Sequence, residues 1–134
     1  MAKKILIVDD DKDLVESLSQ VLQSRGYETA AAYSAAEGLK TLLAEKPDLV
    51  ILDVMMETDT AGFEAAGQIR SGRPFSRYRD VRTVPLIILT AIGQVTNSRF
   101  SLDPGDSFLP GVNAFLTKPV DLDELVQKIA ALLG

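Results

Sequence analysis

Residues 5–11 read Ile-Leu-Ile-Val-Asp-Asp-Asp, a short apolar run that ends in three carboxylates. A second run of this kind, Leu49 to Leu52, ends in Asp53. Uninterrupted apolar runs of this length are typical of strands that are buried on both faces, as in a parallel sheet. Because parallel strands all end at the same edge, the two runs predict carboxylates gathered at that edge, where open α/β sheets place their ligands.

Two further segments bring a hydroxyl and an amine to the same edge. The run at residues 86–89 ends in Thr90, and a short segment from about residue 112 ends in Lys118-Pro119. Strands are predicted at residues 5–8, 27–33, 48–53, 84–90 and 113–117, and helical patterns separate them. This alternation predicts an α/β fold, a five-stranded parallel sheet with helices on both faces.

The helices carry start and stop signals of their own. Asp11 is predicted to cap the first helix, which ends at Gly26, and Ser34 followed by Glu37 is a capping-box pattern. A third helix is predicted over Ala61–Ser71, and the last helix follows Asp121.

Residues 93–111 should contain a fourth helix. Pro104-Gly105 and Pro110-Gly111 limit that helix to its first two turns or so, because proline cannot continue a helix.

Composition excludes several classes of protein. The 134 residues fit one domain, and no apolar stretch approaches the ~20 residues of a membrane span, which predicts a cytoplasmic protein without membrane contact. The chain has no Cys and no His, so any metal should be a hard, oxygen-binding cation. The net charge of -5 disfavours direct binding to nucleic acid.

Two stretches depart from the regular alternation, at about residues 72–83 and 101–111. The first carries Arg73, Arg77, Arg79 and Arg82, just after Arg70. We interpret it as a solvated insertion, with partner or ligand binding as the alternative.

Four fragments of the sequence, taken in order, resemble the receiver domain of bacterial two-component response regulators. They are Ile-Leu-Ile-Val-Asp-Asp-Asp, Ile-Leu-Asp-Val-Met-Met, Ile-Leu-Thr-Ala and Phe-Leu-Thr-Lys-Pro. The resemblance extends from about Lys4 to Leu133. It implies a CheY-like, flavodoxin-like doubly wound sheet of order 2-1-3-4-5 with a short or irregular fourth helix. We expect a single receiver domain over residues 1–134 without an output domain. A stand-alone protein, a relay component and a fragment of a longer regulator or hybrid kinase all stay open.

The resemblance assigns the chemistry of the edge. Asp53 would be the nucleophile that forms an acyl phosphate. Asp9, Asp10 and Asp53 would crowd three carboxylates together, which a divalent cation relieves, and Mg²⁺ fits these oxygen ligands. The backbone carbonyl of Met55 would complete the protein's contribution to the metal. The side chains of Met55 and Met56 are expected to pack in the core.

The remaining positions are implied to bind the phosphoryl group and to switch. Lys118 would pair with the phosphoryl group, and the Thr90 hydroxyl would donate to one of its oxygens. Phe115 stands where the family carries its switch aromatic, and Lys118-Pro119 resembles the family's cis peptide. The switch residues are therefore Thr90, Phe115 and Pro119.

The implied function is that of a phosphoacceptor in two-component phosphorelay signalling. A histidine kinase or phosphotransfer protein would supply the phosphoryl group, and the downstream protein target stays open. The chain would catalyse only its own phosphorylation and dephosphorylation, and the resemblance allows a dimer that depends on phosphorylation.

The chain also departs from the family. Glu57 stands where the family usually has Pro, and Gly62 comes one residue late, so the loop beside the nucleophile is altered. Two hypotheses follow from neighbouring residues: apolar Met55 and Ile92 limit access of water to the phosphoryl group, and residues 93–111 order on phosphorylation or partner binding.

Three rivals stay open. A phosphorylation-independent binding module keeps the fold without the chemistry. An aspartate-nucleophile phosphatase of the haloacid dehalogenase type carries Asp-x-Asp on its first strand, whereas Asp53-Val54-Met55 comes on the third. A flavodoxin-type flavin binder needs a phosphate loop after the first strand, where Asp9-Asp10-Asp11 would repel phosphate.

Overall fold

The computed structural model describes residues 2–58, 60–71, 73–91 and 112–133. Its strands are β1 (Lys4–Val8), β2 (Glu28–Ala32), β3 (Leu49–Asp53), β4 (Leu86–Ala91) and β5 (Ala114–Lys118). Its helices are α1 (Lys12–Ser24), α2 (Ala35–Glu45), α3 (Ala61–Arg70), the 3-10 turn η1 (Arg79–Val81) and α5 (Leu122–Leu133). Each predicted strand and each predicted helix that falls in the described ranges is present, with ends that differ by one or two residues.

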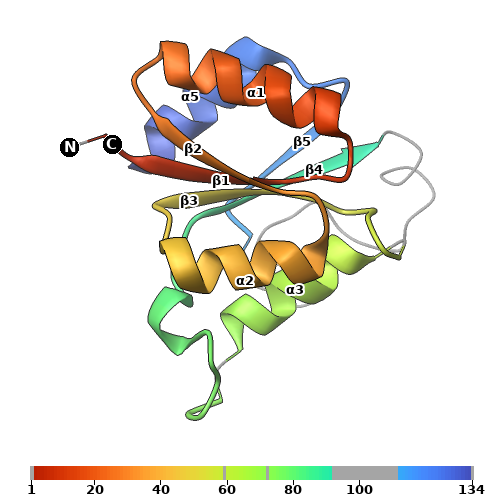
Figure 1. Ribbon diagram of the computed structural model, residues 1–134, viewed down its shortest axis with the longest axis vertical. Helices are drawn as coiled ribbons and strands as arrows, with labels where there is room; N and C mark the ends of the chain where they lie inside the picture. The colour runs from red at the N-terminus through yellow and green to blue at the C-terminus, as the bar shows by residue number, and fades with distance from the viewer. Residues whose placement is uncertain (1, 59, 72, 92–111, 134) are drawn as a thin grey trace.

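The five strands form one parallel sheet of order β2-β1-β3-β4-β5 (Figure 1). This confirms the predicted doubly wound, flavodoxin-like fold. The chain reverses its direction of winding after β2, so β1 and β3 are neighbours at the centre of the sheet. The carboxyl ends of β1 and β3 therefore lie side by side, with β4 next to β3.

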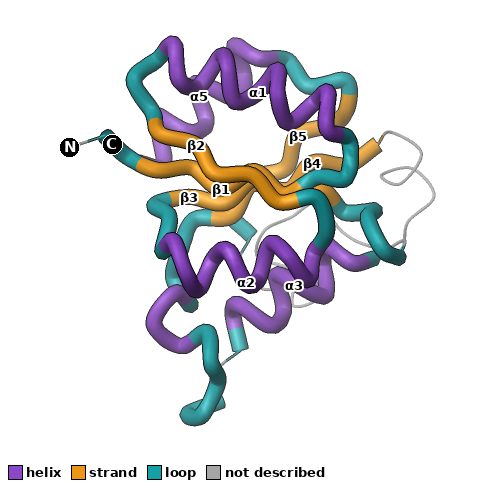
Figure 2. Tube along the Cα trace, in the orientation of Figure 1, coloured by secondary structure: helices purple, strands orange, loops and turns teal. Residues whose placement is uncertain are grey.

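Helices cover both faces of the sheet (Figure 2). Alternate residues of the buried strands point to opposite faces, so Leu6 and Val8 pack with α2 and α3, whereas Ile5 and Ile7 pack with α1 and α5. Two hydrophobic cores result, one on each side of the sheet.

The predicted caps are confirmed. Asp11 Oδ1 accepts a hydrogen bond from the Leu14 amide at 3.1 Å, and Ser34 Oγ accepts one from the Glu37 amide at 3.1 Å. These side chains satisfy amide groups that the first turn of a helix leaves without backbone partners. They also fix where α1 and α2 leave the carboxyl edge of the sheet.

Some predictions fall on residues outside those that the structure describes. The short or irregular fourth helix, the insertion at about residues 101–111, the ordering of residues 93–111 and the position of Ile92 all lie there. Among the described residues, no helix is both long and apolar enough to cross a membrane.

Candidate functional site

Four neighbouring strand ends place polar side chains at the carboxyl edge of the sheet. Asp9 and Asp10 follow β1, Asp53 is the last residue of β3, and Thr90 lies near the end of β4. Lys118 ends β5, where it is paired in register with Ala91 of β4. The sheet order thus brings together side chains that are more than a hundred residues apart in sequence.

Lys118 joins the two buried carboxylates. Its Nζ lies 3.0 Å from Asp9 Oδ2 and 3.1 Å from Asp53 Oδ1. The Asp9 side chain is fully buried and that of Asp53 is 5% exposed, whereas Lys118 remains 27% exposed. Two buried negative charges therefore share one ammonium group, and the site carries excess negative charge.

The residues fit a divalent cation. One carboxylate oxygen from each of Asp9, Asp10 and Asp53 lies within 4.8 Å of the others, and only Asp10 is exposed. Asp9 Oδ1 accepts a hydrogen bond from the Asp11 amide at 2.9 Å. Asp9 Oδ2 accepts no aligned hydrogen bond from the described residues, although Lys118 Nζ is close to it. A buried carboxylate oxygen without a hydrogen-bond donor is a suitable ligand for a hard cation such as Mg²⁺.

The pKa of Asp53 reflects this crowding. Burial raises the pKa of Asp53 to about 6, the charge of Asp9 adds to the increase, and the charge and hydrogen bond of Lys118 oppose it. The carboxyl group is therefore mostly ionised above pH 7, as a nucleophile must be.

Lys118 remains a cation in the same environment. Burial lowers the pKa of Lys118, but its close contact with Asp9 and the charges of Asp53 and Asp9 outweigh burial, so the net change is upward. A permanently charged ammonium group thus stands beside the Asp53 carboxylate.

The other predicted residues lie around this centre. Thr90 is buried and paired in register with Thr117, and Phe115 is half-buried against the core on the side of α2 and α3. The Lys118-Pro119 peptide bond is cis, as predicted. Thr90 thus lies on β4, Phe115 lies on β5, and Pro119 follows β5 directly.

The two methionines after Asp53 differ from the prediction. Met56 packs partly buried against the core, but the Met55 side chain is 43% exposed, so the expectation that it packs in the core is wrong. Met55 follows the last buried residue of this segment, Val54, and its side chain leaves the core at the start of the loop.

Glu57 has a role that its sequence position did not reveal. Its Oε1 accepts from the Ala35 amide at 2.7 Å, and its Oε2 accepts from the Ala36 amide at 3.0 Å. Burial acts to raise the pKa of Glu57, but these two amide hydrogen bonds outweigh it and lower the pKa. The loop after Asp53 is thereby attached to the first turn of α2, where the helix dipole favours a negative charge.

We expect Glu57→Gln to destabilise the protein by about 1 kcal/mol, because an amide side chain accepts only one of the two bonds and carries no charge. Chemical denaturation at pH 7.5 measures this change. Glu16→Gln, an exposed substitution in the middle of α1, is the control and should stay within about 0.5 kcal/mol of the parent. Equal stability of the two variants would contradict the role of Glu57 as a cap.

Gly62 allows α3 to approach the backbone of Asp53. Its amide donates to the Val54 carbonyl at 2.8 Å, and a Cβ atom at this position would stand 2.0 Å from the Asp53 carbonyl oxygen. The close packing of α3 against the end of β3 therefore requires glycine here.

A parallel sheet that gathers three carboxylates and a lysine at its carboxyl edge defines a class of doubly wound α/β proteins suited to phosphoryl transfer at an aspartate. Comparison with known proteins identifies the family: the model of the response regulator receiver domain matches residues 5–130. The chain belongs to this family.

Relatives and solved structures agree with this assignment. The transcriptional regulatory protein GlrR of Escherichia coli (strain K12) is 39% identical over 125 residues, which are 93% of this chain and 25% of GlrR. The response regulator MprA of Mycobacterium ulcerans (strain Agy99) is 35% identical over 134 residues, 99% of this chain and 51% of MprA. The chain thus spans a quarter to a half of these relatives.

Two solved structures are similar over nearly their whole length. The CheY-like receiver domain protein of Methanospirillum hungatei JF-1 has a TM-score of 0.77 and 32% identity, and the match covers 99% of this chain and 94% of that one. The receiver domain of a signal transduction histidine kinase from Syntrophus aciditrophicus has a TM-score of 0.79 and 31% identity, with coverage of 98% and 90%. This chain is accordingly a receiver domain of two-component signalling.

Proposed function

We propose that Asp53 accepts a phosphoryl group from a histidine kinase or phosphotransfer protein, and that this reaction switches a protein-binding surface. The observation that carries the proposal is the position of Asp53, a buried carboxylate on the central strand β3 with Lys118 Nζ 3.1 Å away. The relatives are named as regulators, which supports a signalling role.

In the proposed reaction an Asp53 carboxylate oxygen attacks phosphorus. The bond between phosphorus and the donor's nitrogen or oxygen breaks, its electron pair leaves with the donor, and an acyl phosphate remains on Asp53. In this proposal the chain catalyses only its own phosphorylation and dephosphorylation.

Asp9, Asp10, Asp53 and the backbone carbonyl of Met55 would hold Mg²⁺. When bound, the cation neutralises charge on the carboxylates and on the transferring oxygens. The unmatched negative charge of the site and the buried oxygen of Asp9 support this assignment.

Lys118 and Thr90 would receive the new phosphate. The Lys118 ammonium group pairs with a phosphoryl oxygen in place of Asp53, and the Thr90 hydroxyl donates to another. Movement of Thr90 toward the phosphate opens space beside β5, and Phe115 fills it by a change of packing, since it has no hydroxyl group. Pro119 fixes the backbone that follows Lys118.

We further propose that residues 1–134 form a single receiver domain that acts in the cytoplasm. The proposal includes a downstream protein partner that receives the signal and a dimer that forms on phosphorylation. Direct contact with nucleic acid is not part of it, because the net charge is -5.

The test is the intact mass of the protein after incubation with acetyl phosphate. We expect one added phosphoryl group in the presence of Mg²⁺, none after chelation, and none in Asp53→Asn under either condition. A folded wild-type protein that gains no phosphate from acetyl phosphate or from phosphotransfer proteins would instead favour the phosphorylation-independent binding module. Turnover of a general phosphomonoester would favour the phosphatase.

A further inference from the structure

The insertion between α3 and β4 presents basic and aromatic side chains on the side of the molecule away from Asp53. Because α3 runs back from the carboxyl edge, the insertion begins at the end of α3 that is far from this edge, at the lower left of Figure 1. We call its outward-facing residues, Arg73, Phe75, Arg77 and Arg79, the arginine–phenylalanine surface.

Internal contacts hold the insertion in place. Arg70 donates through Nη1 to the Arg82 carbonyl at 2.5 Å and through Nη2 to Asn113 Oδ1 at 3.1 Å. Arg82 Nη2 donates to the Arg73 carbonyl at 3.2 Å, and Val81 is buried in the core. The interpretation of a solvated insertion is therefore wrong for Arg82, which together with Arg70 at the end of α3 organises the segment.

The arginine–phenylalanine surface itself is turned to solvent. Phe75 is 95% exposed, and Arg73, Arg77 and Arg79 are exposed and form no ion pair with the residues that the structure describes. Because the Phe75 side chain buries almost no apolar surface, it does not stabilise the isolated chain.

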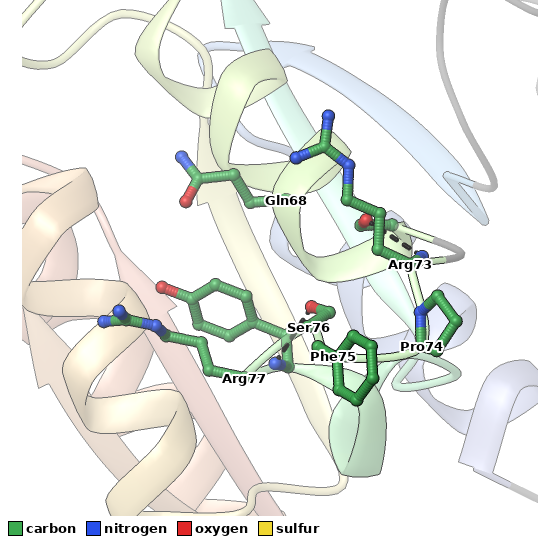
Figure 3. Close-up of a pocket in the computed structure, with 8 residues that line it drawn as sticks. Gln68, Arg73, Pro74, Phe75, Ser76 and Arg77 are labelled. Carbon is green, nitrogen blue, oxygen red and sulfur yellow. Dashed lines mark hydrogen bonds between the residues drawn. The ribbon is translucent and has the colours of Figure 1, made fainter.

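A hollow of about 590 Å³ is lined by Arg73, Phe75 and Arg77 of this surface (Figure 3). Arg73 and Gln68 line one side of it, and Arg77 and Phe75 extend along the other. The hollow has room for an apolar side chain, and guanidinium groups stand on both of its sides.

Charge identifies the occupant. Residues 70–82 carry five of the chain's fourteen basic residues and one acidic residue, although the whole chain has a net charge of -5. Long polyanions such as nucleic acids and anionic membranes would also be repelled by the acidic remainder of the chain. A short acidic segment would contact only the arginines. Arginine and aromatic side chains are also the types that dominate binding energy between proteins.

We propose that the arginine–phenylalanine surface docks an acidic segment of a partner protein. Carboxylates of the segment pair with Arg73 and Arg77, whose planar guanidinium groups bind carboxylates through two parallel hydrogen bonds. One apolar side chain of the segment enters the hollow and contacts Phe75. The surface is separate from the phosphoacceptor edge, so this contact and the transfer chemistry are distinct functions of the chain.

The test is selection of a random peptide-display library on the immobilised chain. Counter-selection uses Phe75→Ala, and fluorescence anisotropy then measures the affinity of synthetic copies of the enriched peptides. We expect peptides rich in Asp and Glu with one large apolar residue, and about tenfold or greater loss of affinity for Phe75→Ala and for Arg77→Ala.

Arg25→Ala is the matched control, because it removes an exposed arginine at the end of α1 and should leave the affinity unchanged. All three variants should keep the parent's thermal midpoint, since the side chains removed are exposed. Enriched peptides without acidic residues, equal binding to Phe75→Ala, or self-association of the chain that Phe75→Ala abolishes would each overturn the proposal, the last by assigning the surface to a second copy.

Discussion

Asp53→Asn should make the metal-free protein more stable at pH 8, by about 2 kcal/mol, although it removes the proposed phosphoacceptor. The carboxyl edge holds two buried carboxylates, Asp9 and Asp53, and one ammonium group, Lys118. An uncharged side chain at position 53 leaves one buried pair, Lys118 with Asp9, in place of three charges that do not balance.

The pH dependence follows from the pKa of Asp53. This pKa is about 6 in the folded protein, whereas its ordinary value, which applies to the unfolded chain, is 3.8. The folded state holds this proton more tightly, so the contribution of Asp53 to the free energy of unfolding falls as pH rises from about 3.8 to about 6 and is constant above that range. In Asp53→Asn the side chain at position 53 does not titrate, so this decrease in the free energy of unfolding does not occur. The difference between variant and parent should therefore be present at pH 8 and absent below the unfolded pKa, at pH 3.5.

Denaturant titration of both proteins at the two pH values, in the presence of a chelator, measures this difference. Asp10→Asn provides the comparison: Asp10 is exposed, so removal of its charge should stabilise the protein much less. A parent more stable than Asp53→Asn at pH 8 without metal would contradict the account of an overcrowded site. Addition of Mg²⁺ should stabilise the parent and have a smaller effect on Asp53→Asn.

Gly62→Ala should destabilise the protein by about 3 kcal/mol or more and reduce phosphorylation at the same time. The added Cβ would meet the Asp53 carbonyl oxygen at 2.0 Å and the Val54 Cα at 2.8 Å. Backbone atoms cannot move aside as a flexible side chain can, so α3 must shift away from β3. The Asp53 carboxylate is then displaced with the end of β3.

The same helix supplies a matched control. A Cβ atom on Gly67 would meet nothing within 4 Å, and alanine is a better helix former than glycine by about 0.5–1 kcal/mol. Gly67→Ala should therefore stabilise the protein and leave phosphorylation unchanged. Thermal unfolding, together with phosphorylation by acetyl phosphate, distinguishes the two variants. The packing argument fails if Gly62→Ala unfolds at the temperature of the parent.

Much of the fold and of the candidate site was predictable because its determinants are local. The run that precedes Asp9 and the run that ends in Asp53 are apolar throughout, as strands buried on both faces must be. Once the strands are placed, the parallel sheet itself brings Asp53 and Lys118 to one edge, so no detail of side-chain packing was needed to find them.

What was missed depends on contacts between distant segments. Glu57 caps α2, which begins 22 residues earlier, and nothing in the local sequence indicates which amides its carboxylate reaches. Arg70 and Arg82 resembled the exposed arginines around them, and only the path of the insertion turns them inward. Met55 is apolar in sequence but lies just past the end of β3, where the chain leaves the core.

The most direct test of the central claim is to identify the residue that carries the phosphoryl group. Borohydride reduces an aspartyl phosphate to homoserine, which peptide mass spectrometry locates in the sequence. After reaction with acetyl phosphate and Mg²⁺, we predict homoserine at position 53 and at neither Asp9 nor Asp10, and none in a chelated sample. Homoserine at another aspartate, or at position 53 without Mg²⁺, would contradict the assignment of Asp53 as a metal-dependent phosphoacceptor.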